Sequence, residues 1–184
     1  EDPVVVAIQP AGQRRAALLG VVPGIVRRAG AGRRLRVVAL VDVLDHRPNY
    51  VPILGGTNDL GWNASLQDIF DNLISMYDQV LRMGSVPIPV TIPSIRVEDA
   101  AGSREGQEWV QEHVRRRRQV NQLIQEYADS KGIAHVDLFA ATAEHESGQL
   151  AASYSNDGIH LTTAGYQLFA ERVAQVLRPL LARP

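Results

Sequence analysis

The chain has 184 residues, of which 45% are hydrophobic and 21% charged, as is usual for one globular domain with a sizeable core. Its net charge of −1 gives no strong field that would attract nucleic acid or an anionic membrane, so we expect neither as a partner. The absence of cysteine excludes disulfides, thiolate metal sites and cysteine nucleophiles. No apolar run reaches the roughly 18 residues that a membrane-spanning helix needs.

The chain begins at Glu1 without a charged and apolar leader, which we interpret as a processed product or a fragment. We expect a soluble protein, cytoplasmic or secreted, and its compartment and oligomeric state stay open. Residues 1–47 differ in composition from the rest, with eight Arg and no Lys, Ser, Thr or aromatic residue. We interpret them as the atypical N-terminal part of a single domain whose core spans 48–184. A shifted reading frame and an Arg-rich helical face are both compatible with this composition.

From residue 48 onward, strand-like and helix-like segments alternate. Short apolar runs predict strands at 50–54, 86–92 and 133–139, although Pro87 and Pro89 weaken the second. Apolar residues at helical spacing predict helices at 66–83, 107–130 and from 163 to 178 or slightly beyond, with Trp109 among the inward positions of the second. Thr162 or Thr163 is expected to cap the last helix.

This alternation predicts an α/β fold with a parallel sheet covered by helices on both faces. In open sheets of this kind, ligands bind at the carboxyl ends of the strands. Three segments come directly after the predicted strands: the block Gly56-Thr57-Asn58-Asp59, the pair Pro93-Ser94, and the loop 140–160. We therefore expect the functional groups in these three segments.

The segment Asp157-Gly158-Ile159-His160 carries the strongest chemical signal. A carboxylate three residues before a histidine can orient the imidazole through one ring nitrogen, which leaves the other nitrogen to act as a general base. Taken alone, this spacing is common and more often structural than catalytic.

The block Gly55-Gly56-Thr57-Asn58-Asp59 gives a second signal. Glycine allows the backbone to approach a ligand closely, and the Asn58 amide can donate a hydrogen bond to a developing oxyanion. Taken alone, the block is more readily explained as a turn at the end of a strand, in which Asn and Asp bond their own backbone.

Together the two motifs resemble the SGNH/GDSL hydrolase family of serine esterases. Gly56-Thr57-Asn58-Asp59 is similar to its Gly-x-Asn-Asp block, Asp157-Gly158-Ile159-His160 to its Asp-x-x-His block, and residues 161–166 to the run after that histidine. The resemblance implies a flavodoxin-like, three-layer α/β/α sandwich and hydrolysis of carboxylester, lipid or acetylated-sugar esters without a cofactor or a metal. It also implies His160 as the base, Asp157 as its orienting partner and Asn58 as an oxyanion donor.

The family's nucleophile, the serine of a Gly-Asp-Ser block after the first strand, has no counterpart in this sequence. In one interpretation 4–8 is the first strand, and 9–12 (Gln-Pro-Ala-Gly) stands where Gly-Asp-Ser belongs. In the other, the first strand is lost, 15–19 starts the first helix, 24–27 is the second strand, and Gly30 or Gly32 supplies the second oxyanion N–H. Substitute hydroxyls exist, each better explained as a turn or capping residue: Thr57, Ser94, Ser153 and Ser155.

The sequence therefore supports a hydrolase of the Ser-His-Asp type that is impaired because its nucleophile is missing. The alternative is a non-catalytic binding module that keeps the pocket, and a weaker one is an interaction protein that uses an Arg-rich helix. The run 115–118 of four arginines is interpreted as a solvated helix face, because glutamates flank it. The histidines show no metal-ligand spacing.

Overall fold

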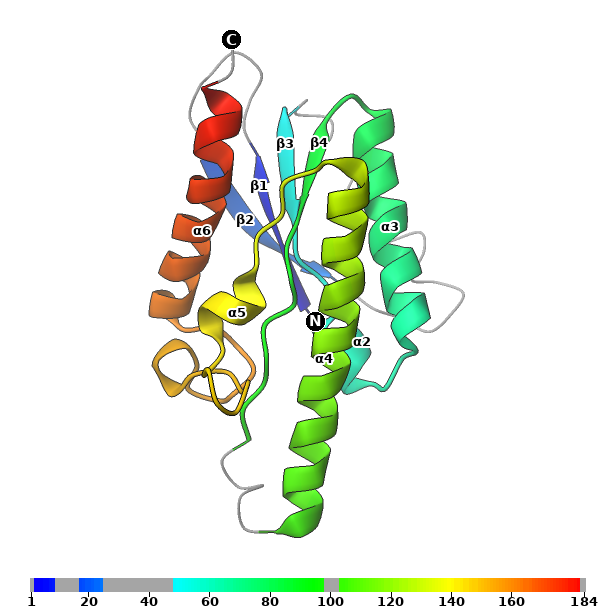
Figure 1. Ribbon diagram of the computed structural model, residues 1–184. Coiled ribbons are helices and arrows are strands. Elements are labelled where there is room, and N and C mark those ends of the chain that lie inside the picture. The colour runs from blue at the N-terminus through cyan, green and yellow to red at the C-terminus, as the bar shows by residue number, and fades with distance from the viewer. Residues whose placement is uncertain (1, 9–16, 25–47, 98–102, 183–184) are drawn as a thin grey trace.

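The structure is a computed structural model that describes residues 2–8, 17–24, 48–97 and 103–182. Strand β3 (Tyr50–Ile53) pairs in parallel with β4 (Val86–Pro89), with Tyr50 opposite Val86. Helix α3 (Leu66–Arg82) connects the two strands, so β3, α3 and β4 form a βαβ unit. Figure 1 shows α3 and α4 (Arg104–Lys131) on one side of the strands and α6 (Thr163–Leu181) on the other. The expected α/β/α sandwich is confirmed.

The predicted strand at 133–139 is wrong in its extent. Only Val136 pairs with the sheet, through one isolated parallel bridge to Val90. The bridge consists of the Val136 N–H bonded to the Pro89 carbonyl at 2.9 Å and the Thr91 N–H bonded to the Val136 carbonyl at 3.0 Å. In a parallel strand alternate N–H groups point to opposite neighbours, and those of Val86 and Val90 point to β3. Continuing this register, Pro89 would donate to residue 134, and proline has no N–H, which limits the ladder before Val136. After Val136 the strand ends because helix α5 (Leu138–Thr142) begins.

Two apolar clusters fill the spaces on the two faces of the sheet. On the first face, α3 and α4 pack against alternate strand residues, and Val51 and Ile53 are at most 1% exposed. On the second face, α6 packs through Phe169, Val173 and Leu177 against Ile88 and Val90. A sheet buried on both sides explains why its strands read as continuous apolar runs rather than as alternating ones.

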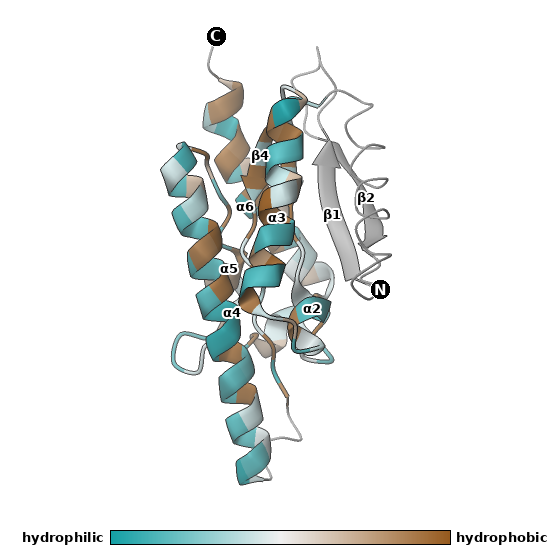
Figure 2. Ribbon diagram, turned by 90° about the vertical axis from the view of Figure 1, so that its right-hand side faces the viewer, coloured by the Kyte–Doolittle hydropathy of each residue, from teal (hydrophilic) through white to brown (hydrophobic). Residues whose placement is uncertain are grey.

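The three long helices begin at side-chain caps. Ser65 Oγ accepts from the Asp68 N–H at 3.0 Å at the start of α3, and Ser103 Oγ accepts from the Gly106 N–H at 3.0 Å at the start of α4. Thr162 caps α6, as predicted, by accepting from the Gly165 N–H. The outer surfaces of α3 and α4 are largely hydrophilic (Figure 2).

Two expectations for α4 were wrong. Trp109 is 51% exposed, because α4 begins at Arg104 and its first turns extend past the sheet (Figure 1). The four-arginine run is not uniformly solvated, since Arg117 is 2% exposed and its Nε donates to the Pro93 carbonyl at 3.1 Å. Arg117 therefore ties α4 to the segment that comes after β4.

The N-terminal strand is present, as β1 (Asp2–Ile8), and it pairs antiparallel with β2 (Ala17–Gly24). This arrangement agrees with the interpretation in which 4–8 is the first strand. It contradicts the interpretation in which a helix starts at 15–19, because residues 17–24 are extended. By their hydrogen bonds β1 and β2 form a two-stranded antiparallel sheet separate from β3 and β4, which is a departure from the expected parallel sheet. Residues 9–12, Gly30 and Gly32 lie outside the described residues.

Candidate active site

The Asp157–His160 pair has the geometry that the sequence motif predicts. His160 Nδ1 lies 2.7 Å from Asp157 Oδ2. The second carboxylate oxygen, Oδ1, accepts from the N–H groups of Ile159 at 2.9 Å and His160 at 2.8 Å. The tight turn thus brings the carboxylate back onto the residues after it, an Asx-type arrangement that fixes both the backbone and the ring.

These contacts define the protonation of the pair. The hydrogen bond from the His160 ring, together with the N–H groups of His160 and Ile159, holds the pKa of Asp157 well below its usual range. An ionised carboxylate can only accept, so His160 Nδ1 carries the proton of the shared hydrogen bond. In the neutral imidazole Nε2 is then unprotonated, as a general base requires.

The pair lies at the surface. The side chains of His160 and Asp157 are 67% and 55% exposed. Solvent screens interactions between such exposed groups, so the pair's own attraction contributes little to the folded state. Other contacts must therefore set the position of this turn.

Arg96 supplies several of those contacts, although no sequence motif pointed to it. Its N–H donates to the Gly158 carbonyl at 2.8 Å, and its guanidinium Nη2 donates to the Ser155 carbonyl at 2.7 Å. Gly158 has a φ of +78°, and a Cβ atom there would lie 1.7 Å from the Arg96 carbonyl oxygen. Only glycine fits this position, for both steric and conformational reasons.

The block around Asn58 comes directly after β3. Gly56 has a φ of +107°, and a Cβ atom there would come within 2.7 Å of Ile92 Cδ1. The chain then turns into the short helix α2 (Thr57–Gly61), in which Asn58 is half-buried. Helix α2, which contains Asn58, and the 140–160 loop both lie at the carboxyl ends of the strands, the lower end in Figure 1. The oxyanion role of Asn58 stays a proposal.

Two of the four substitute hydroxyls are buried and make structural hydrogen bonds. Ser94 is 2% exposed and its Oγ donates to the Gly148 carbonyl at 2.6 Å. Ser155 is 1% exposed and its Oγ donates to Asp157 Oδ1 at 3.2 Å, so it bonds the carboxylate rather than the base. The other two occupy helical positions: Ser153 lies exposed in the 3-10 helix η2 (Ala152–Tyr154), and Thr57 is the first residue of α2.

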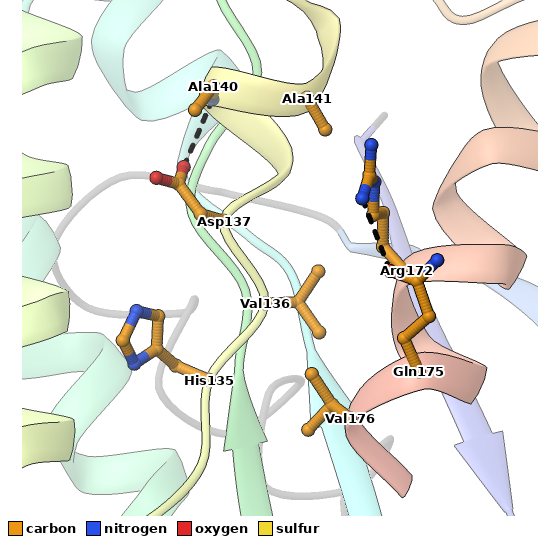
Figure 3. A pocket seen from close by; sticks show the side chains of 8 residues that line it. All are labelled: His135, Val136, Asp137, Ala140, Ala141, Arg172, Gln175 and Val176. Carbon is orange, nitrogen blue, oxygen red and sulfur yellow. Dashed lines mark hydrogen bonds between the residues drawn. The ribbon is translucent and has the colours of Figure 1, made fainter. Parts of the chain in front are cut away.

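A cavity of about 360 Å³ lies elsewhere, between residues 135–141 and helix α6 (Figure 3). Helix α5 (Leu138–Thr142) contributes to its wall, and Asp137 Oδ1 caps this helix by accepting from the Ala140 N–H at 3.0 Å. None of the predicted site residues lines this cavity. By its lining residues, the cavity is distinct from the candidate active site.

Within the part of the chain that the structure describes, no group of three or more His, Asp or Glu side chains is arranged to hold a metal ion. Among the same residues, no helix is both long and apolar enough to cross a membrane.

The comparisons with known proteins give the family of the chain. The sequence model of the GDSL-like lipase/acylhydrolase family matches residues 9–168, so the chain belongs to that family. The match begins directly after β1, which ends at Ile8. No curated protein is similar enough to count as a relative.

Solved structures show the same fold. A GDSL-like lipase from Bacteroides thetaiotaomicron has a TM-score of 0.64 at 20% identity, over 80% of this chain and 71% of that one. The lipase/acylhydrolase from Enterococcus faecalis has a TM-score of 0.60 at 20% identity, over 80% and 70%. A catalytic mutant of the acetylxylan esterase Axe2 from Geobacillus stearothermophilus has a TM-score of 0.54 at 20% identity, over 83% and 69%.

Proposed function

We propose that this chain acts on carboxylester bonds, in lipids or acetylated sugars, with His160 as the general base, Asp157 as its orienting partner and Asn58 as an oxyanion donor. The backbone N–H of Gly30 is the proposed second donor. Lipases and an acetylxylan esterase among the structural neighbours support this class of bond, which is common to both kinds of substrate.

The single observation that carries the proposal is the 2.7 Å contact between Asp157 Oδ2 and His160 Nδ1. Because Asp157 is held ionised and accepts from Nδ1, the exposed ring offers an unprotonated Nε2 to a proton donor. A donor pair near the carbonyl oxygen would stabilise negative charge as it develops, by roughly 3–4 kcal/mol per strong donor.

We further propose that hydrolysis by this chain is impaired. Residues 1–47 contain no Ser, Thr or Cys, and the sequence contains no Gly-Asp-Ser. Without a covalent step, His160 Nε2 takes a proton from water while the water oxygen adds to the ester carbonyl. The tetrahedral intermediate then expels the alcohol oxygen, which takes that proton from the imidazolium, leaving an acid and an alcohol. Loss of a triad member leaves only roughly 10³–10⁴-fold acceleration over water.

The test is hydrolysis of a short-chain nitrophenyl ester by the purified chain and by the His160→Ala variant. We expect turnover far below about 1 s⁻¹, the lower end of typical enzyme values. His145→Ala is the matched control, because His145 is also exposed and any surface imidazole can attack an activated ester. The residual rate should fall in His160→Ala and persist in His145→Ala.

Two results would contradict this proposal. Equal rates in both variants would show that His160 is not the base. Turnover of about 1 s⁻¹ or more, blocked by a serine-directed phosphonate, would show that a serine of this chain is an active nucleophile.

A non-catalytic binding module is the second candidate, and the missing Gly-Asp-Ser favours it. It predicts saturable binding of an acetylated xylo-oligosaccharide, measured by ligand-observed NMR, with no release of acetate above that of the His160→Ala variant. Release of acetate that depends on His160 would instead favour the impaired hydrolase.

A further inference from the structure

We propose that Arg96 is a positioning residue for the Asp157–His160 pair, holding the turn that presents the imidazole through its contacts with Ser155 and Gly158. The inference rests on the proposed role of His160 as the base. Arg96 acts through other residues and is not itself placed against the substrate.

The hydrogen bonds of Asp157 fix the conformation of the turn, and two further contacts within the loop close it where the chain enters and leaves. Ser155 and Leu161 form an isolated antiparallel bridge, and the Thr162 N–H donates to the Tyr154 carbonyl at 2.8 Å. These contacts close the loop where α6 begins. They lie on either side of the exposed residues Asp157 and His160 rather than against them.

Arg96 contacts the turn on both sides of Asp157. Its guanidinium binds the Ser155 carbonyl, two residues before Asp157, and its backbone N–H binds the Gly158 carbonyl, one residue after it. The close approach of Gly158 to the Arg96 carbonyl oxygen completes the contact. Arg96 therefore holds the backbone that carries the carboxylate.

Ser155 links this backbone to the imidazole. It is buried, and its Oγ donates to Asp157 Oδ1, the oxygen that also accepts the two backbone N–H groups. Asp157 Oδ2 remains for His160 Nδ1. A shift of Ser155 would thus rotate or displace the carboxylate, and with it the hydrogen bond that selects the Nδ1–H tautomer.

Arg96 directly follows a buried segment of the chain. Residues 91–95 are buried, the Ile95 carbonyl accepts from the Leu150 N–H at 3.0 Å, and Ser94 Oγ bonds the Gly148 carbonyl. The segment continues from β4, so the sheet itself sets the position of Arg96. A rigid support of this kind is what a precisely oriented base requires.

The test reads the tautomer of His160 from its ring ¹⁵N chemical shifts at a pH where the ring is neutral. In the parent chain we expect the Nδ1–H form. Arg96→Met keeps the apolar stem but removes the donor, and should shift the population toward Nε2–H. Arg96→Lys restores one donor and should give an intermediate population. Arg104→Met, at an exposed arginine in the first turn of α4, should leave the tautomer unchanged.

Circular dichroism of each variant separates loss of fold from loss of positioning. If Arg96→Met does not fold, Arg96→Leu also removes the donor, with a shorter apolar side chain. Ring shifts identical to those of the parent chain, in a folded Met or Leu variant, would overturn the proposal. The readout needs no turnover, so failure of the hydrolase proposal and failure of this one remain distinguishable.

Discussion

The side-chain amide of Asn121 makes two hydrogen bonds to the backbone of Ile92, one through its oxygen and one through its nitrogen. Its Oδ1 accepts from the Ile92 N–H at 2.7 Å, and its Nδ2 donates to the Ile92 carbonyl at 2.9 Å. Asn121 belongs to α4 and is 4% exposed. Beyond the end of β4, this side chain therefore provides the two hydrogen bonds that a neighbouring strand would otherwise make to Ile92.

We expect Asn121→Ala to lower the free energy of unfolding by about 2–6 kcal/mol, because it orphans two buried backbone groups of Ile92 that cost about 1–3 kcal/mol each. Thermal or urea unfolding measures the loss. Gln122→Ala, at an exposed neighbour that bonds Glu126, is the control and should stay within about 0.5 kcal/mol. Equal effects of the two substitutions would show that the pairing with Ile92 contributes little.

Gly158→Ala is expected to disrupt the candidate site. The new Cβ would lie 1.7 Å from the Arg96 carbonyl oxygen at a φ of +78°, so the turn must move. The left-handed conformation alone costs about 1–2 kcal/mol for a residue with a Cβ atom. We expect lower stability and loss of the Asp157–His160 hydrogen bond, observed in the His160 ring ¹⁵N shifts.

The control is Gly61→Ala, where an added Cβ atom meets no atom within 4 Å. Its ring shifts and stability should match those of the parent chain. A Gly158→Ala protein with unchanged ring shifts would refute the steric account.

Ser94→Ala should retain the residual ester hydrolysis, because the buried hydroxyl bonds the Gly148 carbonyl rather than a reacting group, and the Leu150–Ile95 hydrogen bond still holds the segment before Arg96. It should lower stability by about 1–3 kcal/mol, since that carbonyl loses a buried donor. Ser153→Ala, at an exposed position, is the comparison and should alter neither quantity. If Ser94→Ala abolished hydrolysis while the protein remained folded, Ser94 would become the nucleophile to pursue.

The lowered pKa of Asp157 predicts how the free energy of unfolding depends on pH. Its pKa is lowered in the folded state, chiefly by the His160 hydrogen bond, from an unfolded value of about 3.9. Because solvent screens these exposed groups, its stabilising contribution is small; it is fully present above about pH 4 and is lost as the pH falls toward the folded pKa. Asp157→Asn lacks this ionisation, so the stability difference between the two proteins should shrink below about pH 4.

Urea unfolding of both proteins at several pH values between roughly 7 and 2 measures this difference. Asp129→Asn, at a carboxylate on the exposed end of α4, gives the matched comparison. A difference between parent and Asp157→Asn that stays constant over the whole range would contradict the lowered pKa.

The sequence by itself determined the helices 66–82 and 163–181 closely, the two paired strands β3 and β4, and the local geometry of the Asp157–His160 pair. The reason is that these features depend on nearby residues: apolar periodicity, side-chain caps, and a carboxylate three residues from its partner. The family resemblance came from the same short motifs.

The tertiary structure alone decided what depends on distant residues. It reduced the strand predicted at 133–139 to one bridge, because Pro89 of the neighbouring strand lacks the N–H that would extend the ladder and because helix α5 begins at Leu138. It buried Arg117 and exposed Trp109, because their environment depends on how far α4 extends past the sheet. It also brought Arg96 against Gly158, a contact between segments far apart in the chain that no local pattern encodes.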